Sequence, residues 1–285
     1  MGFHCSLPRL LAITLTSVAL TLPTALAGDA KDKALTDAVS GSWRTPANVQ
    51  RDVWRKPVDA LTFWGLKPGM AVLELSPGGG WWTEILAPYA RMTKGTYAAT
   101  AADLNNPELS QAARDARAQF EKKFSDQTIY GPITYVNFGL KSQGLGAPNS
   151  VDFVLNGRNI HNWMANGIMD KVMSESFAVL KSGGILAIEE HRNAPDAVQD
   201  PKAPTGYVTE AYVIAAAEKA GFKLAERSEL YANAKDDRDH PFGVWTLPPA
   251  RRTAPQGQPA NPNFDSAPYD AIGESDRMAL RFVKP

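Results

Sequence analysis

A run of polar side chains follows the apolar segment 151–155, and its residue types suit proton transfer and ligand binding. His161 could take a proton from a hydroxyl or amine nucleophile, because a free imidazole titrates near working pH. Arg158 could hold an anionic substrate group, and Asn159 could orient either ligand. Trp163 could stack on a ring or face a cation. In the alternative interpretation, the histidine only caps the next helix and the tryptophan belongs to the core.

A second polar cluster, Glu189-Glu190-His191-Arg192, ends the apolar segment 185–189. His191 is a rival to His161 as the base, and Glu190 could orient it. The alternative interpretation of this cluster is a solvated charged loop.

An acid and three consecutive glycines end the apolar segment 71–75, in the order Glu74-Leu75-Ser76-Pro77-Gly78-Gly79-Gly80. Glycines let a ligand approach the backbone closely, and the helix that follows offers free N–H groups at its first turn. Glu74 could accept hydrogen bonds from a ligand ammonium. Trp81 and Trp82 could form a wall for the ligand or pack in the core. The alternative is a tight turn that binds nothing.

Nucleotide phosphates are the obvious competitors for such a loop. The chain has no Gly-Lys-Ser or Gly-Lys-Thr sequence, which excludes a P-loop. The run Gly78-x-Gly80-x-x-Thr83 lacks the third glycine of the dinucleotide motif. S-adenosylmethionine has an ammonium and a carboxylate but no phosphate, so it suits an acid followed by glycines better.

These residues need a scaffold that brings distant loops together, and segment 67–231 predicts one. Strand-like and helical runs alternate there, which indicates a parallel α/β sheet. Ligands bind beyond the carboxyl ends of the strands in such sheets. No helical run follows the sixth strand, so a final strand at 277–283 is expected to be antiparallel. The expected strands are 71–75, 96–100, 133–138, 151–155, 185–189 and 222–230, and the expected helices are 82–90, 108–124, 168–180 and 210–220.

Two segments flank this predicted core. Residues 28–66 predict helices, and the residues spaced to cover one helical face are Val53, Trp54, Val58, Leu61 and Trp64. Residues 232–273 are rich in Pro, Asn, Asp and Gln, which predicts an ordered loop or extension before the closing segment 274–285. The stretch 236–240, Asp-Asp-Arg-Asp-His, could suggest a metal site. Its spacing is not that of an EF-hand and its charges are mixed, so we expect a solvated loop and no bound metal.

The glycine segment resembles the first motif of class I methyltransferases, in which an acid precedes three alternate glycines. Here that motif extends from Glu74 to Gly80, and Ser76 replaces the first glycine. More narrowly, the chain resembles a family of predicted exported bacterial methyltransferases. The segments that carry this resemblance are 51–57, 78–89, 158–163, 243–249 and 273–278.

The resemblance implies a Rossmann-like class I methyltransferase fold, with a mostly parallel seven-stranded sheet, an antiparallel last strand and helices on both faces. It implies one domain over 28–285 and S-adenosylmethionine as the cofactor. The tip of the second strand carries Thr100 where the family has an acid, so Asp103 is the substitute or else a turn cap. The expected cofactor-binding residues are Glu74, Ser76, Gly78, Gly79, Gly80, Trp81, Asp103 and Asn156.

The N-terminus predicts a secretory signal peptide over residues 1–27. A cationic stretch ending at Arg9 precedes the apolar run 10–22, and Ala25-Leu26-Ala27 fits a cleavage site. The alternatives are an uncleaved anchor and a myristoylation signal at Gly2. The only cysteine, Cys5, would be removed, which excludes disulfides and thiolate chemistry in the mature chain. We expect an exported, periplasmic protein with no stable membrane insertion after cleavage.

Composition and missing motifs exclude several other functions. Lys plus Arg and Asp plus Glu both number 30, and no dense basic run occurs, which argues against a nucleic-acid partner. No Gly-x-Ser-x-Gly elbow and no His-x-x-x-His pair is present. The sequence therefore predicts methyl transfer to a small-molecule acceptor. The alternative is a non-catalytic exported protein that keeps the fold and only binds a ligand.

Overall fold

The computed structural model describes residues 1–4 and 32–285, and residues 32–285 form one compact unit. The predicted signal peptide, apart from its first four residues, lies outside the described residues. Among the residues that are described, no helix is both long and apolar enough to cross a bilayer.

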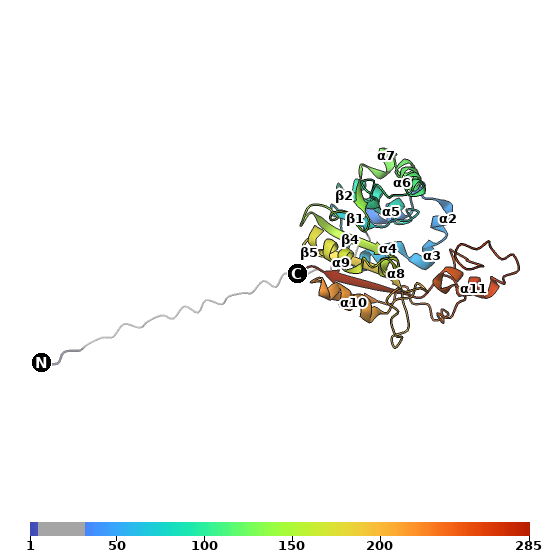
Figure 1. The fold of residues 1–285 in the computed structure, drawn as a ribbon. Coiled ribbons are helices and arrows are strands. Elements are labelled where there is room, and N and C mark those ends of the chain that lie inside the picture. Colours follow the sequence, from blue (N-terminus) through green and yellow to red (C-terminus); the bar gives the residue numbers. More distant parts are fainter. Residues whose placement is uncertain (5–31) are drawn as a thin grey trace. The chain divides into compact units, whose positions relative to one another are not determined.

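The compact unit is built on one seven-stranded sheet in the order β3-β2-β1-β4-β5-β7-β6 (Figure 1). The first five strands pair in parallel, and β7 pairs antiparallel with both β5 and β6. This arrangement confirms the predicted Rossmann-like fold class, including its antiparallel last strand. The strands are β1 (Ala71–Leu75), β2 (Thr96–Ala102), β3 (Ile133–Phe138), β4 (Val151–Gly157), β5 (Leu180–His191), β6 (Lys223–Ser228) and β7 (Arg277–Val283).

Helices bury both faces of the sheet, because successive strand residues point to opposite sides. On β4, Phe153 and Leu155 join one apolar cluster, and Val154 joins the other. Helices α1 (Lys33–Val39), α4 (Pro57–Trp64) and α5 (Thr83–Met92) supply the first cluster. Helices α8 (Ile160–Ala165), α9 (Met169–Val179) and α10 (Glu210–Lys219) supply the second. Helices α6 (Gln111–Lys123) and α7 (Gln127–Tyr130) lie between β2 and β3 in the chain.

The N-terminal segment is helical as predicted, but the prediction that its apolar residues share one helical face was wrong. Two short helices, α2 (Pro46–Val49) and α3 (Asp52–Arg55), precede α4, and Lys56 adopts a left-handed conformation with φ of 38°. This change of direction leaves Val53 69% exposed, whereas Leu61 and Trp64 are buried. The turn instead places the Arg55 side chain inside the protein, with 0% exposure.

The polar extension is ordered and contains the short 3-10 helix η1 (Gly243–Thr246) and α11 (Ala267–Ile272). The predicted solvated loop at 236–240 was wrong at its ends, since Asp236 and His240 are buried. The Asp236 carboxylate accepts hydrogen bonds from Tyr207 Oη at 2.8 Å and from the Asp276 amide at 2.7 Å. His240 Nε2 lies 2.8 Å from the same carboxylate. This buried group fastens the extension to the start of β7.

Glu74, near the end of β1, is enclosed in the core between the sheet and α5. Its Oε2 accepts hydrogen bonds from Tyr97 Oη at 2.5 Å and Thr83 Oγ1 at 2.9 Å. Burial raises the pKa of this carboxyl from 4.5 to about 7, against the lowering effect of the two hydrogen bonds. The acid therefore ties β1 to β2 and α5.

Glu74→Gln is expected to flatten the dependence of stability on pH. Between pH 4.5 and about 7 the folded state holds the Glu74 proton more tightly than the unfolded chain does. Wild-type stability should therefore fall as pH rises through this window, by on the order of 3 kcal/mol. Glutamine carries no such proton, so this loss should disappear. Urea unfolding at several pH values measures it.

Tyr97→Phe serves as the companion variant. It removes a hydrogen bond that lowers the pKa of Glu74, so the fall in stability should extend to higher pH. Equal pH slopes for wild type and Glu74→Gln would contradict the assignment.

Candidate functional site

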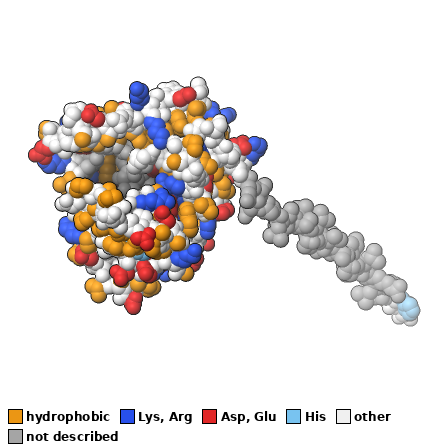
Figure 2. Space-filling view, turned by 90° about the vertical axis from the view of Figure 1, so that its right-hand side faces the viewer, with side chains coloured by type: hydrophobic (Ala, Val, Ile, Leu, Met, Phe, Trp, Pro, Cys, Tyr) orange, Lys and Arg blue, Asp and Glu red, His pale blue; other side chains and the backbone are white. Residues whose placement is uncertain are grey.

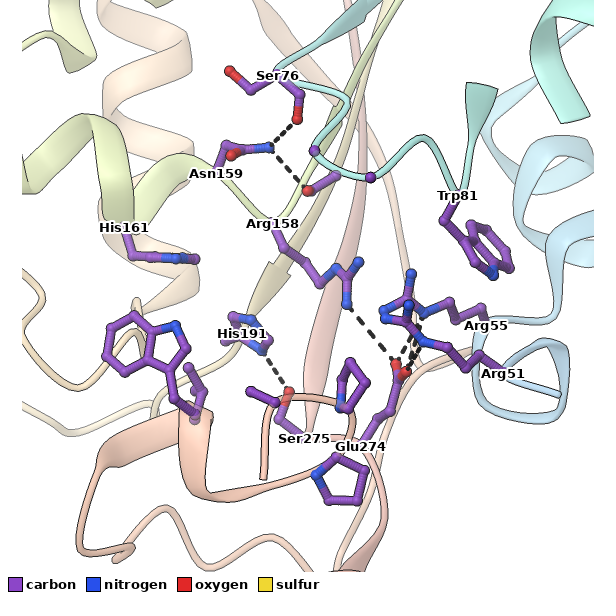
Figure 3. A pocket seen from close by; sticks show the side chains of 18 of the residues that line it. Arg51, Arg55, Ser76, Trp81, Arg158, Asn159, His161, His191, Glu274 and Ser275 are labelled. Carbon is purple, nitrogen blue, oxygen red and sulfur yellow. Dashed lines mark hydrogen bonds and ion pairs between the residues drawn. The ribbon is translucent and has the colours of Figure 1, made fainter. Parts of the chain in front are cut away.

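A pocket of about 350 Å³ lies beyond the carboxyl ends of β1 and β4 (Figure 3). The glycine loop 76–79 and the loop after β4 form two of its sides, and His191 at the end of β5 adds to them. The extension supplies Trp245 and the residues 248–250. A volume of this size is in the range of small-molecule sites.

A second hollow, of about 420 Å³, adjoins the pocket on the β2 side. The two share Ser76, Pro77, Gly78 and Asn159. The second hollow has mainly apolar walls, and Arg117 is the only charged residue that lines it. Together the two hollows border the glycine loop along its length.

The glycine loop turns sharply and is held at both ends. Ser76, Gly78 and Gly80 have positive φ of 49°, 58° and 83°. The Ser76 amide donates to Thr100 Oγ1 at 2.6 Å, and Asn159 Nδ2 donates to the Ser76 carbonyl at 3.1 Å. A β-carbon at Gly78 would meet no atom within 4 Å, whereas one at Gly80 would come within 2.3 Å of the Phe124 ring. Gly78 therefore faces open space, and Gly80 is required for packing.

His161 lies in the pocket at the first turn of α8, and Glu190 holds it there. Glu190 is fully buried at the end of β5. Its Oε1 lies 3.0 Å from His161 Nδ1, and its Oε2 accepts the Ile160 amide at 2.6 Å. Glu190 thus fixes both the start of the helix and the orientation of the imidazole. The predicted alternative of a solvated loop at 189–192 was wrong for both glutamates, which are 0% exposed.

His191 lines the same pocket, with its ring centroid 5.5 Å from that of His161. Its Nδ1 lies 2.5 Å from Ser275 Oγ, so Ser275 and not Glu190 orients the ring. Burial lowers the pKa of His191 well below its ordinary value, and His161, Arg158 and Arg277 lower it further. His191 therefore has little tendency to accept a proton.

Arginines from three parts of the chain meet at the Glu274 carboxylate, as Figure 3 shows for three of them. Arg51 Nε and Arg55 Nε lie 3.1 Å from it, and Arg277 Nη1 lies 2.6 Å away. Arg158 Nη1 approaches the carboxylate to 3.9 Å.

Glu189, behind the pocket, supports the same group. Its Oε1 accepts from Arg277 Nη1 at 2.9 Å and lies 3.5 Å from Arg158 Nε. Arg158 has a positive φ of 61°, which turns the chain between β4 and α8.

The structure brings most of the sequence-predicted site residues together. The predicted residues that line the pocket are Ser76, Gly78, Gly79, Trp81, Arg158, Asn159, His161 and His191. Trp163, in contrast, is buried in the core, as its alternative interpretation held.

Four predicted cofactor residues do not line either hollow. Glu74 is enclosed in the core, and Gly80 packs on Phe124. Asp103 lines a separate depression and accepts the Asn105 amide at 3.0 Å, which is the turn-cap alternative. Asn156 is buried behind the pocket, and neither side-chain polar atom has a hydrogen-bond partner.

Sequence reasoning gave no role to Arg51, Arg55, Glu274 and Ser275, and it gave Trp245 only as a residue that permits a lid over the site. All five line the pocket, and all lie in segments that carry the family resemblance. Their place in those segments was the only sequence signal for them. Their meeting depends on how the two ends of the chain pack on the sheet.

Comparisons with known proteins give the class of the core. Residues 73–188 match a family model described as a methyltransferase domain. A search of curated proteins found no match for the chain. The core therefore has a Rossmann-like class I methyltransferase fold, and the match over 73–188 supports S-adenosylmethionine as its cofactor.

Solved structures with a similar fold include three described as S-adenosylmethionine-dependent methyltransferases. The one from Aquifex aeolicus is 21% identical, with 63% of this chain and 86% of that chain covered and a TM-score of 0.47. The one from Methanosarcina mazei is 13% identical, with 79% and 96% covered and a TM-score of 0.49. The one from Mesorhizobium loti is 16% identical, with 79% and 96% covered and a TM-score of 0.43.

The residues present fit S-adenosylmethionine, with one departure. Gly78 and Gly79 leave open space beside the backbone, and the apolar second hollow suits an adenine ring. The departure is the ribose, because no carboxylate is among the residues that line that hollow. Thr100, at the expected place, instead holds the Ser76 amide. The glycine loop, Asn159 and the apolar walls would therefore hold the cofactor.

Gly78→Ala is expected to weaken S-adenosylmethionine binding on the order of 10-fold, since its β-carbon would enter the space beside the loop. Its cost to stability should be about 1 kcal/mol, from the positive φ alone. Gly80→Ala is the matched contrast, because its clash with Phe124 should lower stability by roughly 1–3 kcal/mol more. Calorimetric titration and thermal unfolding separate the two. Unchanged affinity in Gly78→Ala would show that the ligand does not lie against this loop.

Proposed function

We propose that the protein transfers a methyl group from S-adenosylmethionine to a small-molecule acceptor, with His161 as the general base. The observation that carries the proposal is the His161–Glu190 pair in the pocket that the glycine loop borders. When bound, the cofactor supplies an electrophilic methyl group on a positively charged sulfur. The acceptor must lose a proton as it becomes methylated, so a base is needed.

The His161 ring is oriented for that proton transfer. An ionised carboxylate can only accept hydrogen bonds, so Nδ1 carries the proton that Glu190 accepts and Nε2 has a free lone pair. Nε2 can then take the proton of a hydroxyl or amine, and Glu190 stabilises the imidazolium that results. His191 is less suitable, because its surroundings lower its pKa well below the ordinary value.

The shape of the pocket supports a small acceptor. The extension places Trp245 edge-on to His161, with 5.7 Å between ring centroids. This segment is held in place by backbone hydrogen bonds, including the Val244 amide to the Thr205 carbonyl at 2.9 Å. It covers the side of the pocket next to His161.

We also propose that the protein is exported to the bacterial periplasm. The support is the predicted signal peptide over 1–27 and the lack of cysteine after Cys5.

The decisive test of the proposed activity has two stages. Calorimetry first measures binding of S-adenosylmethionine to the purified protein. A screen of small hydroxyl and amine compounds then measures formation of S-adenosylhomocysteine. No binding would overturn the proposal. Binding without turnover across the screen would favour the ligand-binding protein considered as the alternative.

His161→Asn is expected to lower kcat with an acceptor from that screen by ~10²- to 10⁴-fold, which is the usual contribution of a general base. Affinity for S-adenosylmethionine should remain within about 2-fold of wild type, a difference of under 1 kcal/mol. His191→Asn is the control and should retain most of kcat. If only His191→Asn lost activity, the base would be His191 and the proposed role of His161 would be wrong.

Glu190→Gln tests the positioning role of the carboxylate. A neutral amide stabilises an imidazolium less, so the rising limb of the pH–rate profile should move to lower pH and reach a lower plateau. An unchanged profile would contradict that role.

Export predicts that the mature protein recovered from the periplasmic fraction begins at Gly28. N-terminal sequencing of each cell fraction measures this directly. Recovery only of chains that begin at Met1 would contradict cleavage.

A further inference from the structure

We propose that the acceptor is an anion, whose carboxylate or phosphate group binds among Arg51, Arg55 and Arg158 while its nucleophile lies at His161. This inference rests on the proposed function, because it names the substrate class of that pocket.

Unpaired N–H groups of Arg55 are the first observation. Arg55 is 0% exposed and lines the pocket, yet only its Nε is hydrogen-bonded, to Glu274. Both Nη atoms are buried without a hydrogen-bond partner. A buried donor without an acceptor costs about 1–3 kcal/mol, and more when it is charged. An anionic ligand would supply the missing acceptors.

The charge of the pocket is the second observation. Its lining residues include three arginines, Arg51, Arg55 and Arg158, but only one carboxylate, Glu274. The Arg277–Glu189 pair behind them is balanced. Even with the buried Glu190 included, the pocket keeps a positive excess. S-adenosylmethionine itself has a net positive charge, from its sulfonium and ammonium against one carboxylate. An acceptor with negative charge would offset this repulsion.

The titration behaviour of Arg51 agrees with that excess. Burial lowers the pKa of Arg51, and Glu274 raises it again. Arg158 and Arg277 also lower it, so these guanidinium groups lie close enough to repel the charge of Arg51.

The guanidinium groups are held in position before any ligand arrives. Arg55 stacks on the Trp81 ring, with 4.9 Å from Cζ to the ring centroid. Trp81 is fixed in turn, because its Nε1 donates to the Asn48 carbonyl at 2.8 Å. In Figure 3, Arg51 and Arg55 reach Glu274 from one side and Arg158 reaches it from the other. Fixed donors of this kind suit planar carboxylates and phosphates.

A metal cation is the competing occupant, since His161, Glu190 and His191 have ligand atoms close enough to share one. Both Glu190 oxygens already accept hydrogen bonds, Oε1 from the His191 amide at 2.8 Å and Oε2 from the Ile160 amide at 2.6 Å. The neighbouring arginines also repel a cation. The same pocket therefore favours an anion.

The test is calorimetric titration of the full chain saturated with S-adenosylhomocysteine, using benzoate and phenyl phosphate as anionic probes. Benzyl alcohol is the neutral probe of similar size. We expect each anion to bind at least about 10-fold more tightly than the alcohol. Equal affinities for anions and alcohol would overturn the inference.

Arg55→Met and Arg51→Met are the diagnostic variants. Each should weaken anion binding on the order of 10-fold and leave benzyl alcohol binding unchanged. Arg51 is partly exposed, so its variant remains informative if the fully buried Arg55 proves necessary for folding. Arg227→Met removes one exposed guanidinium outside the pocket and should change neither affinity. Anion binding that all three variants retain would overturn the proposal.

The carboxylate that binds the arginines could also belong to the methionine part of the cofactor and not to the acceptor. Decarboxylated S-adenosylmethionine separates the two sources. If the arginines hold the acceptor, Arg55→Met should leave the affinities for the intact and decarboxylated cofactors in the wild-type ratio. Loss of preference for the intact cofactor, with no loss of phenyl phosphate binding, would overturn the inference.

Failure of the proposed function gives a different result. In that case S-adenosylhomocysteine itself does not bind. Titration of the two anions into the protein alone then still decides whether the arginine site exists.

Discussion

The architecture of the pocket depends on the ion pairs that the Glu274 carboxylate makes with several arginines. Glu274 lies just before β7 and binds Arg51 and Arg55 from the N-terminal helices and Arg277 from β7 itself. These partners come from opposite ends of the chain. The carboxylate therefore holds the two ends together beside the pocket. A buried charge is stable only when it is paired, so removal of Glu274 would leave several guanidinium groups uncompensated.

The two sides of the glycine loop differ in polarity. The β2 side is apolar and suits an adenine ring, whereas the β4 side carries His161 and the arginines. Ser76, which has a positive φ, lines both hollows and lies at the boundary. Asn159 joins the two loops there, through the carbonyls of Ser76 and Gly157. On the face drawn in Figure 2, basic and acidic side chains are interspersed, so the positive excess is a property of the pocket and not of that surface.

Much of the fold could be predicted because it depends on local patterns. Apolar runs of strand length, separated by helical runs, located all seven strands, and the missing helix after 222–230 predicted the antiparallel β7. The prediction of one apolar helical face in the N-terminal segment was wrong, because the pattern from Val53 to Trp64 matches one continuous helix. Lys56 breaks it with a left-handed turn, which periodicity does not reveal.

By itself, the sequence determined the sheet, the glycine loop and the polar loops at the strand ends. Those loops converge because parallel strands all end at one edge, so the meeting of His161, Arg158 and Ser76 followed from topology. Only the tertiary structure decided which polar groups face the pocket. Glu74 and Asp103 do not face the pocket. Glu190 contacts the His161 ring and not the His191 ring. The arginine cluster was also decided there, because it joins residues about 220 positions apart through burial and charge pairing, which leave no periodic signal in the chain.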